Sequence, residues 1–171
     1  MKIFVAASYS SKVNYDTGEV FSEYRSWLEN ILTAIEQQGH GVFCALRADQ
    51  YKINDADPAE AFSLDMFHLQ ESDIVLALVT DKASAGVQTE IGVGIALNKH
   101  VIVAHDTQDD LAYFNAAMVK ANVVRELVLP LSADRLSEAL TKNINKAFEE
   151  PATIMANTPP VRNENLKKRN A

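Results

Sequence analysis

The sequence has little that could cross-link the chain or anchor it in a membrane. Cys44 is the single cysteine among 171 residues, which excludes a disulfide framework and a cysteine-based zinc cluster and fits a reducing compartment. No apolar run approaches the roughly 20 residues of a membrane span. The apolar residues 3–7 are too few for a signal sequence and lead at once into a polar loop, so they are predicted to form a buried strand. We therefore expect a cytoplasmic protein without a membrane segment.

The charge is acidic and unevenly spread. The net charge is −7, and residues 151–171 contribute four basic side chains and one acidic one, so residues 1–150 carry −10. An acidic surface repels the phosphate backbone of nucleic acids at long range. We therefore expect no nucleic-acid polymer among the partners of this chain.

The hydrophobic pattern alternates between short apolar runs and helical stripes. Strands are predicted at residues 3–7, 41–46, 73–79, 101–104 and 123–129. Helices are predicted at residues 21–35, 57–71, 86–98 and 133–148. This alternation predicts an α/β fold: a doubly wound, Rossmann-like or flavodoxin-like sheet of five parallel strands with helices on both faces. Residues 1–148 would form this single domain, and the basic, Pro- and Asn-rich residues 149–171 a disordered tail.

Two of the predicted helices carry further local signals. The helix at 57–71 begins with Asp57 as a capping acid and Pro58 at the first helical position. Its inward-facing side chains are predicted to be Phe62, Met66 and Leu69. In the helix at 86–98, Gly92 and Gly94 are expected to allow close approach of the backbone to the sheet.

Candidate site residues gather where strands lead into helices. In an open α/β sheet, ligands bind beyond the carboxyl ends of the strands, and the loops at residues 7–12, 80–86 and 105–110 would lie there. The middle loop is the most informative, because Ser84 and Gly86 open a helix whose free N–H groups form an anion site. Glu90 follows within two turns, so its side chain points back toward this edge.

Two carboxylates suggest chemistry at this edge. Taken alone, Glu90 could be a structural acid near the positive end of its helix, and Asp65 a solvated flank of the preceding one. Together they suit glycosidic chemistry, because one carboxylate can attack an anomeric carbon while the other handles a proton or a hydroxyl. The hydroxyl groups of Ser8, Ser10 and Ser84 could hold a phosphate or a sugar nearby.

Other combinations of residues give weaker signals of a functional site. The four histidines lack metal-ligand spacing, and neither a dinucleotide-binding fingerprint nor a P-loop is present. We therefore predict neither a metal nor a cofactor. Tyr9 is one of several aromatic residues beside predicted loops, where its ring could stack on a base or pack at the base of the loop.

The spacing of five residues resembles the nucleoside 2-deoxyribosyltransferase superfamily, and within it the branch of 2′-deoxynucleoside 5′-monophosphate N-glycosidases. These residues are Asp65, Ser84, Gly86, Glu90 and Gly92. The resemblance implies that Glu90 is the nucleophile and that Asp65 orients the sugar or assists proton transfer to the leaving base. It also implies that Ser84 contacts phosphate, because the monophosphate hydrolases have a phosphate-contacting serine at this position, where the transferase branch has an aspartate.

The resemblance also bears on the phosphate contacts and on assembly. The hydrolases have an arginine where Ser10 stands, and Lys12 is the candidate to replace it. A serine that these enzymes lend from the neighbouring subunit falls at Ala116, and Asn115 beside it could donate instead. A homodimer is implied, with residues 111–119 as a candidate interface or as ordinary packing on the sheet.

Three functions stay open from the sequence. The first is cleavage of the N-glycosidic bond of a nucleoside or (deoxy)nucleoside 5′-monophosphate, through a glycosyl intermediate on Glu90. The second is base exchange by a nucleoside 2-deoxyribosyltransferase. The third is a nucleotide-binding or signalling module that has the same fold and no turnover.

Overall fold

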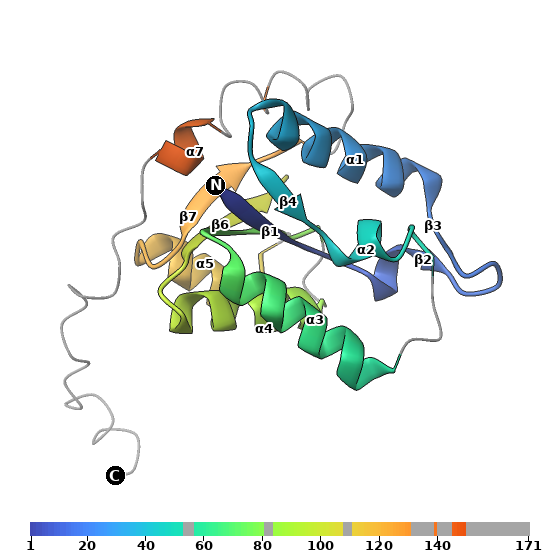
Figure 1. Ribbon diagram of the computed structural model, residues 1–171. Helices are drawn as coiled ribbons and strands as arrows, with labels where there is room; N and C mark the ends of the chain where they lie inside the picture. Colours follow the sequence, from blue (N-terminus) through green and yellow to red (C-terminus); the bar gives the residue numbers. More distant parts are fainter. Residues whose placement is uncertain (53–56, 81–83, 108–110, 131–138, 140–144, 150–171) are drawn as a thin grey trace, which may run out of the picture.

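A parallel five-stranded sheet organises the chain (Figure 1). The computed structural model describes residues 1–52, 57–80, 84–107, 111–130, 139 and 145–149. The strands of the sheet are β1 (Lys2–Ala7), β4 (Gly41–Phe43), β5 (Ile74–Leu78), β6 (His100–His105) and β7 (Arg125–Val128). A small hairpin is formed by β2 (Val13–Asn14) and β3 (Glu19–Val20), after the 3₁₀ turn η1 (Ser10–Lys12). The helices are α1 (Ser22–Gln37), α2 (Ala45–Ala48), α3 (Pro58–Glu71), α4 (Ala85–Ala96), α5 (Tyr113–Lys120) and α7 (Asn145–Glu149).

The strand order confirms the predicted doubly wound fold. Its order is β4-β1-β5-β6-β7, and every neighbouring pair is parallel. The chain first moves from β1 out to the edge strand β4 and then returns to the other side of β1 for β5. The direction of winding therefore changes between β1 and β5, and the carboxyl ends of these two strands form the crevice where such sheets bind ligands.

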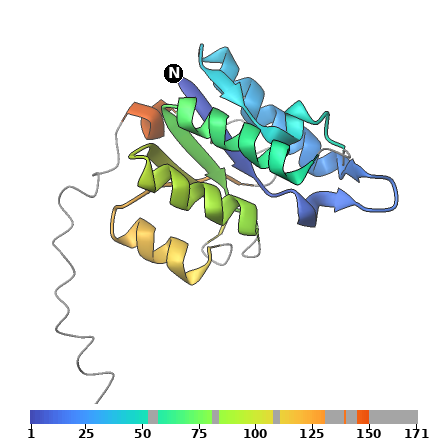
Figure 2. The same ribbon diagram turned by 60° about the horizontal axis from the view of Figure 1, so that its bottom comes forward.

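Helices cover both faces of the sheet (Figures 1 and 2). On one face, Ile3, Val5 and Leu76 pack with the buried stripe of α1 and with Phe148 of α7. On the other face, strand residues pack with α3 and α4; the buried members of this second core include Phe4, Val75, Leu69, Val87 and Ile91. The central strands are buried on both sides, which explains their uninterrupted apolar runs.

Three local predictions were wrong. The second strand ends at Phe43 instead of residue 46, and the apolar residues that follow form α2, whose Leu46 is still buried. Phe62 is 57% exposed, although Leu69 is buried and Met66 packs against the core. A Cβ on Gly92 would meet nothing within 4 Å, whereas one on Gly94 would lie 3.0 Å from Val101 and 3.1 Å from Val75. Only Gly94 is therefore needed for close packing of α4 on the sheet.

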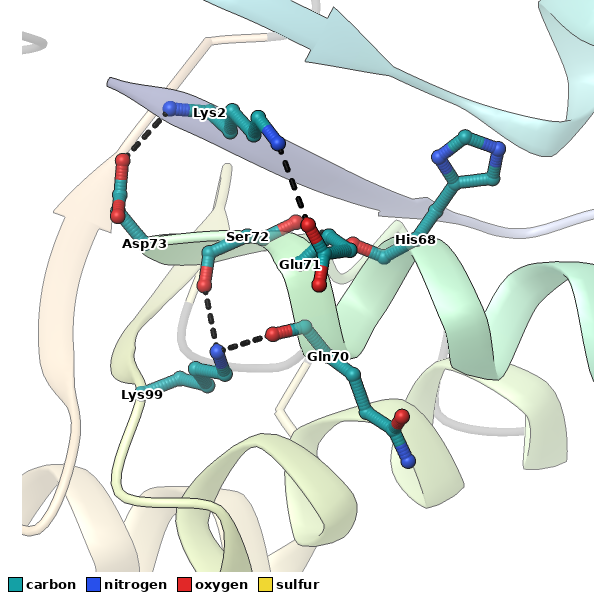
Figure 3. Close-up of polar contacts among 7 residues, drawn as sticks. All are labelled: Lys2, His68, Gln70, Glu71, Ser72, Asp73 and Lys99. Carbon is teal, nitrogen blue, oxygen red and sulfur yellow. Dashed lines mark hydrogen bonds and ion pairs between the residues drawn. The ribbon is translucent and has the colours of Figure 1, made fainter.

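The helix from residue 57 to 71 forms as predicted. Asp57 caps it by accepting a hydrogen bond from the backbone N–H of Ala59 at 2.7 Å. At its other end the ammonium of Lys99 donates to the backbone carbonyls of Gln70 (2.5 Å) and Ser72 (2.7 Å) (Figure 3). These carbonyls have no partner within the helix, so a cation placed there both satisfies them and complements the helix dipole.

The C-terminal predictions are tested only in part. The predicted helix at 133–148 falls largely outside the described residues, and α7 covers its last turn. The predicted tail from 149 onward also lies outside them, apart from Glu149 at the end of α7.

Candidate active site

Glu90 lies on α4, the first described helix after β5 along the chain. The helix packs against β5, β1 and β6, and Gly94 lets it approach the sheet closely one turn after Glu90. The side chain is largely withdrawn from solvent. Burial raises the pKa of Glu90 to about 8, and the negative charge of Asp65 adds to this effect. A carboxylate in such a setting is poorly solvated, which favours its use as a nucleophile or a base.

Asp65 is half-buried on α3, the helix beside α4. Burial also raises its pKa, the charge of Asp49 raises it further, and His68 opposes these effects. The structure therefore brings the two predicted acids together, although they come from different helices. Below pH about 8 the pair holds at least one proton, and two carboxylates that share a proton can act as an acid and a nucleophile at the same time.

The amino end of α4 is open toward the same edge of the sheet. Ser84 occupies the N-cap position, but within the described residues its hydroxyl makes no capping hydrogen bond. Gly86 is exposed, and a Cβ there would meet nothing within 4 Å. The free N–H groups of the first turn, the Ser84 hydroxyl and the space beside Gly86 suit an anionic group.

The loop after β1 contributes residues of different exposure. Ser8 is 1% exposed, and its hydroxyl has no hydrogen-bond partner in the part of the chain that the structure describes. Ser10 is exposed in η1. The ammonium of Lys12 lies 5.5 Å from the centre of the Tyr24 ring on α1. Lys12 is thus held against an aromatic face, where it adds positive charge to this loop.

Asn115 lies on α5 and is completely buried. Neither polar atom of its amide has a hydrogen-bond partner among the described residues. The side chain points into its own subunit, so its predicted contribution to a neighbouring site has no support from this arrangement and stays a prediction.

Sequence reasoning missed Asp49. It lies at the C-terminal end of α2, beyond the carboxyl end of β4, and its charge adds to burial in raising the pKa of both Tyr9 and Asp65. Tyr9 was only one of several aromatic candidates, but its hydroxyl donates to the backbone carbonyl of Lys52 at 3.2 Å. The loop after the second strand belongs to the same edge of the sheet. Because the strand predicted at 41–46 extended too far, the sequence analysis did not recognise this loop.

Other features carry no chemistry of this kind. Burial raises the pKa of the Cys44 thiol to about 11, so the thiol stays protonated and packs as an apolar group. In the described residues no group of three or more His, Cys, Asp or Glu side chains could hold a metal ion. No helix among them has the length and apolar character to cross a membrane.

A groove of about 320 Å³ lies between β4 and the end of α3. It is lined by residues such as Phe43, Phe67 and His68, and none of the candidate residues lines it.

A family model described as nucleoside 2-deoxyribosyltransferase matches residues 17–155. The chain belongs to the nucleoside 2-deoxyribosyltransferase family. It is therefore an enzyme of this family, which acts on nucleosides. The matched range includes Asp65 and Glu90 and begins after the loop that carries Ser8. No curated protein matches the sequence significantly.

Several solved structures share the fold of this family member. BlsM is 20% identical over 89% of this chain and 96% of its own, with a TM-score of 0.68. The CMP N-glycosidase BcmB of Clostridium botulinum is 19% identical over 85% of this chain and 99% of its own, with a TM-score of 0.60. The 2-deoxyribosyltransferase of the psychrotolerant bacterium Bacillus psychrosaccharolyticus is 17% identical over 68% of this chain and 81% of its own, with a TM-score of 0.54.

Proposed function

We propose that this family member cleaves the N-glycosidic bond of a nucleoside or (deoxy)nucleoside 5′-monophosphate through a covalent glycosyl intermediate on Glu90, and releases the free base. The observation that carries the proposal is the pair of poorly solvated carboxylates, Glu90 and Asp65, at the carboxyl edge of the sheet. The fold shared with a CMP N-glycosidase supports the same reaction class.

In the first step, an oxygen of the ionised Glu90 carboxylate attacks C1′ of the sugar and forms a C–O bond. The C1′–N bond breaks, and its electron pair stays on the nitrogen of the base. Asp65 gives its proton to the departing base, which then leaves as a neutral molecule. Because both pKa values are raised, the two carboxyl groups share one proton near neutral pH, and the reactive form is the one that carries this proton on Asp65 and leaves Glu90 ionised.

In the second step, water resolves the glycosyl ester. The oxygen of the water attacks C1′, the Asp65 carboxylate takes a proton from the water, and the bond from C1′ to Glu90 breaks. The products are the free base and the sugar or sugar phosphate. Glu90 and Asp65 return to their initial protonation states, so the cycle needs no further reactant.

A 5′-phosphate would bind at the amino end of α4. The N–H groups of its first turn and the Ser84 hydroxyl are the proposed ligands, and Gly86 leaves room for the phosphate oxygens. The loop of Ser8, Ser10 and Lys12 would line the other side, and Lys12 supplies the positive charge. Because residues 1–150 carry −10, this attraction must be local.

A panel of nucleosides and 5′-monophosphates tests the function directly. Release of free base, measured by chromatography, is expected for at least one substrate and is expected to be lost in Glu90→Gln. If no substrate releases base, or if Glu90→Gln releases it as fast as the parent enzyme, the proposal is wrong.

Base exchange is the second candidate, because the fold is also that of the Bacillus 2-deoxyribosyltransferase. Both reactions would share the glycosyl intermediate on Glu90 and differ in what resolves it. Incubation of a deoxynucleoside with a second free base separates them, since only a transferase forms the exchanged nucleoside in quantity.

We also propose that the enzyme is a homodimer. On α5, Tyr113 is 92% exposed and Phe114 is 71% exposed, and adjacent exposed aromatic side chains are typical of protein interfaces. Light scattering of the parent enzyme is expected to give twice the 18.9 kDa mass of one chain. A monomeric mass would contradict this proposal.

A further inference from the structure

The groove between β4 and the end of α3 opens at the edge of the sheet opposite to the candidate active site. One wall is formed by the first residues of β1 and β4, from Lys2 and from Gly41 onward, and the other wall by the last turns of α3. Its volume of about 320 Å³ is comparable to that of the smallest ligand pockets, which measure about 300 Å³. The groove is therefore large enough to hold the side chains of a further segment.

Aromatic side chains line this groove and are only partly covered. The ring of His68 points from α3 toward β4 (Figure 3) and stacks on the ring of Phe43, with ring centres 3.7 Å apart. Phe67 meets His68 edge-on at 5.4 Å and is 57% exposed. Among the described residues, β4 is an edge strand with no strand on its outer side. An exposed aromatic wall beside an unpaired strand edge suits the binding of an apolar segment.

The last described residues lie next to this groove. The ring of Phe148 on α7 packs edge-on against the ring of His40 at 5.5 Å, and His40 directly precedes Gly41, which lines the groove. Both ribbon views place α7, the start of β1 and the end of α3 at one end of the sheet (Figures 1 and 2). An extended chain advances by about 3.5 Å per residue, so the five residues beyond Glu149 can span about 17 Å. Residues 150–156 are therefore within reach of the groove.

Residues 151–156 match the groove in chemistry. They carry no charge and include two large apolar side chains, Ile154 and Met155, and a methionine adapts to irregular surfaces and makes favourable contacts with aromatic rings. Residues 151–171 together carry +3, whereas residues 1–150 carry −10, so opposite charge favours contact of this segment with its own domain. Because the segment is joined to the domain, its effective concentration at the groove is high, which favours it over a separate partner.

We propose that residues 151–156 bind in the groove of their own chain. The side chains of Ile154 and Met155 would pack against the rings of Phe43 and Phe67. For these residues the inference departs from the disordered tail that the sequence predicts. Binding there would hold the C-terminal segment across the end of α3, away from the candidate active site, so the inference does not depend on the proposed function.

Disulfide trapping in the full chain tests this inference. Ala156→Cys supplies a thiol in the segment, and Glu71→Cys supplies one on the rim of the groove. Glu60→Cys is the matched control, because it is the same change at an exposed residue of α3, about 16 Å away along the helix. The native Cys44 is buried and does not compete. We expect the pair with Glu71→Cys to cross-link within one chain on the order of 10-fold faster than the pair with Glu60→Cys.

Further substitutions and the unmodified chain complete the test. Ile154→Asp should slow the cross-link to the rate of the control pair, because it brings a charge to an apolar groove, whereas Val161→Asp, beyond the segment, should leave the rate unchanged. Equal rates for the two cysteine pairs, or no effect of Ile154→Asp, would overturn the inference. A covalent dimer as the main product would assign the groove to a second copy and also overturn it. In the unmodified chain, NMR should show nuclear Overhauser effects between side-chain protons of Ile154 or Met155 and the ring of Phe67, and their absence would contradict the inference without any substitution.

Discussion

The carboxylate of Asp65 on α3 lies close enough to that of Glu90 on α4 for its charge to add to burial in raising the pKa of Glu90 to about 8. The two helices pack against each other and against β1, so the pair depends on the tertiary fold. If the active form carries one proton on the pair, activity should rise as the first proton leaves and fall above pH about 8 as the last one leaves.

Asp65→Asn should abolish the loss of activity above pH about 8. Without the second carboxylate, Glu90 alone titrates, and its pKa falls because a negative charge is gone. We expect kcat/KM to drop by about 100-fold from loss of the acid. We also expect kcat/KM to increase with pH and then level off, whereas in the parent enzyme it should rise and fall again. The measurement is kcat/KM between pH 5 and 10, and Glu60→Gln on the exposed start of α3 is the control. If kcat/KM of Asp65→Asn falls at alkaline pH as it does in the parent enzyme, Asp65 and Glu90 do not share a proton.

Glu90 should also make the stability of the enzyme depend on pH. Its pKa in the folded chain, about 8, lies above its ordinary value of 4.5. Between these values the folded chain keeps a proton that the unfolded chain has released, so the free energy of unfolding falls as pH rises through this window. Glu90→Gln should therefore be more stable than the parent enzyme at pH 9, by roughly 2–4 kcal/mol. The difference should shrink toward pH 4, as measured by urea unfolding; a constant difference would contradict the burial of the charge.

Two glycines on α4 offer a matched comparison. Gly94→Ala would place a Cβ 3.0 Å from Val101 and 3.1 Å from Val75. Both valines are buried in the core, so either their side chains or the helix must give by a few tenths of an ångström. We expect a loss of about 1–3 kcal/mol in the free energy of unfolding, together with lower activity to the extent that Glu90 moves with the helix. Gly92→Ala faces open space and should gain about 0.5–1 kcal/mol from higher helix propensity. Equal effects of the two substitutions would show that α4 does not approach the sheet as described.

Much of this arrangement could be predicted from the sequence, and the exceptions have physical causes. The start of α3 was predictable because its signal is local: Asp57 bonds the N–H of a residue two positions away. The end of β4 was not predictable, because Cys44 and Leu46 are apolar and buried, as they would also be in a strand, and periodicity cannot separate a short strand from a short helix. Asp49 could not be identified from the sequence, because its position depends on a left-handed turn that is held by Glu29, a residue distant in sequence.

Lys99 should stabilise the junction of α3 and β5. Its ammonium binds two backbone carbonyls at the end of α3, beside the buried Ser72 (Figure 3). Lys99→Met keeps the length of the side chain but removes both hydrogen bonds, and should cost about 1–3 kcal/mol in the free energy of unfolding. Lys2→Met removes an exposed ion pair with Glu71 and should cost less than about 1 kcal/mol. Chemical denaturation of both variants measures the difference, and equal costs would rule out the capping role.

The central claim, that Glu90 becomes glycosylated, is tested most directly by mass spectrometry of the enzyme quenched in acid during turnover. The account predicts that a fraction of the parent enzyme gains the mass of the sugar or sugar phosphate, on the peptide that contains Glu90, and that Glu90→Gln gains none. An adduct on another residue, an adduct that persists in Glu90→Gln, or turnover by Glu90→Gln at the parental rate would contradict it.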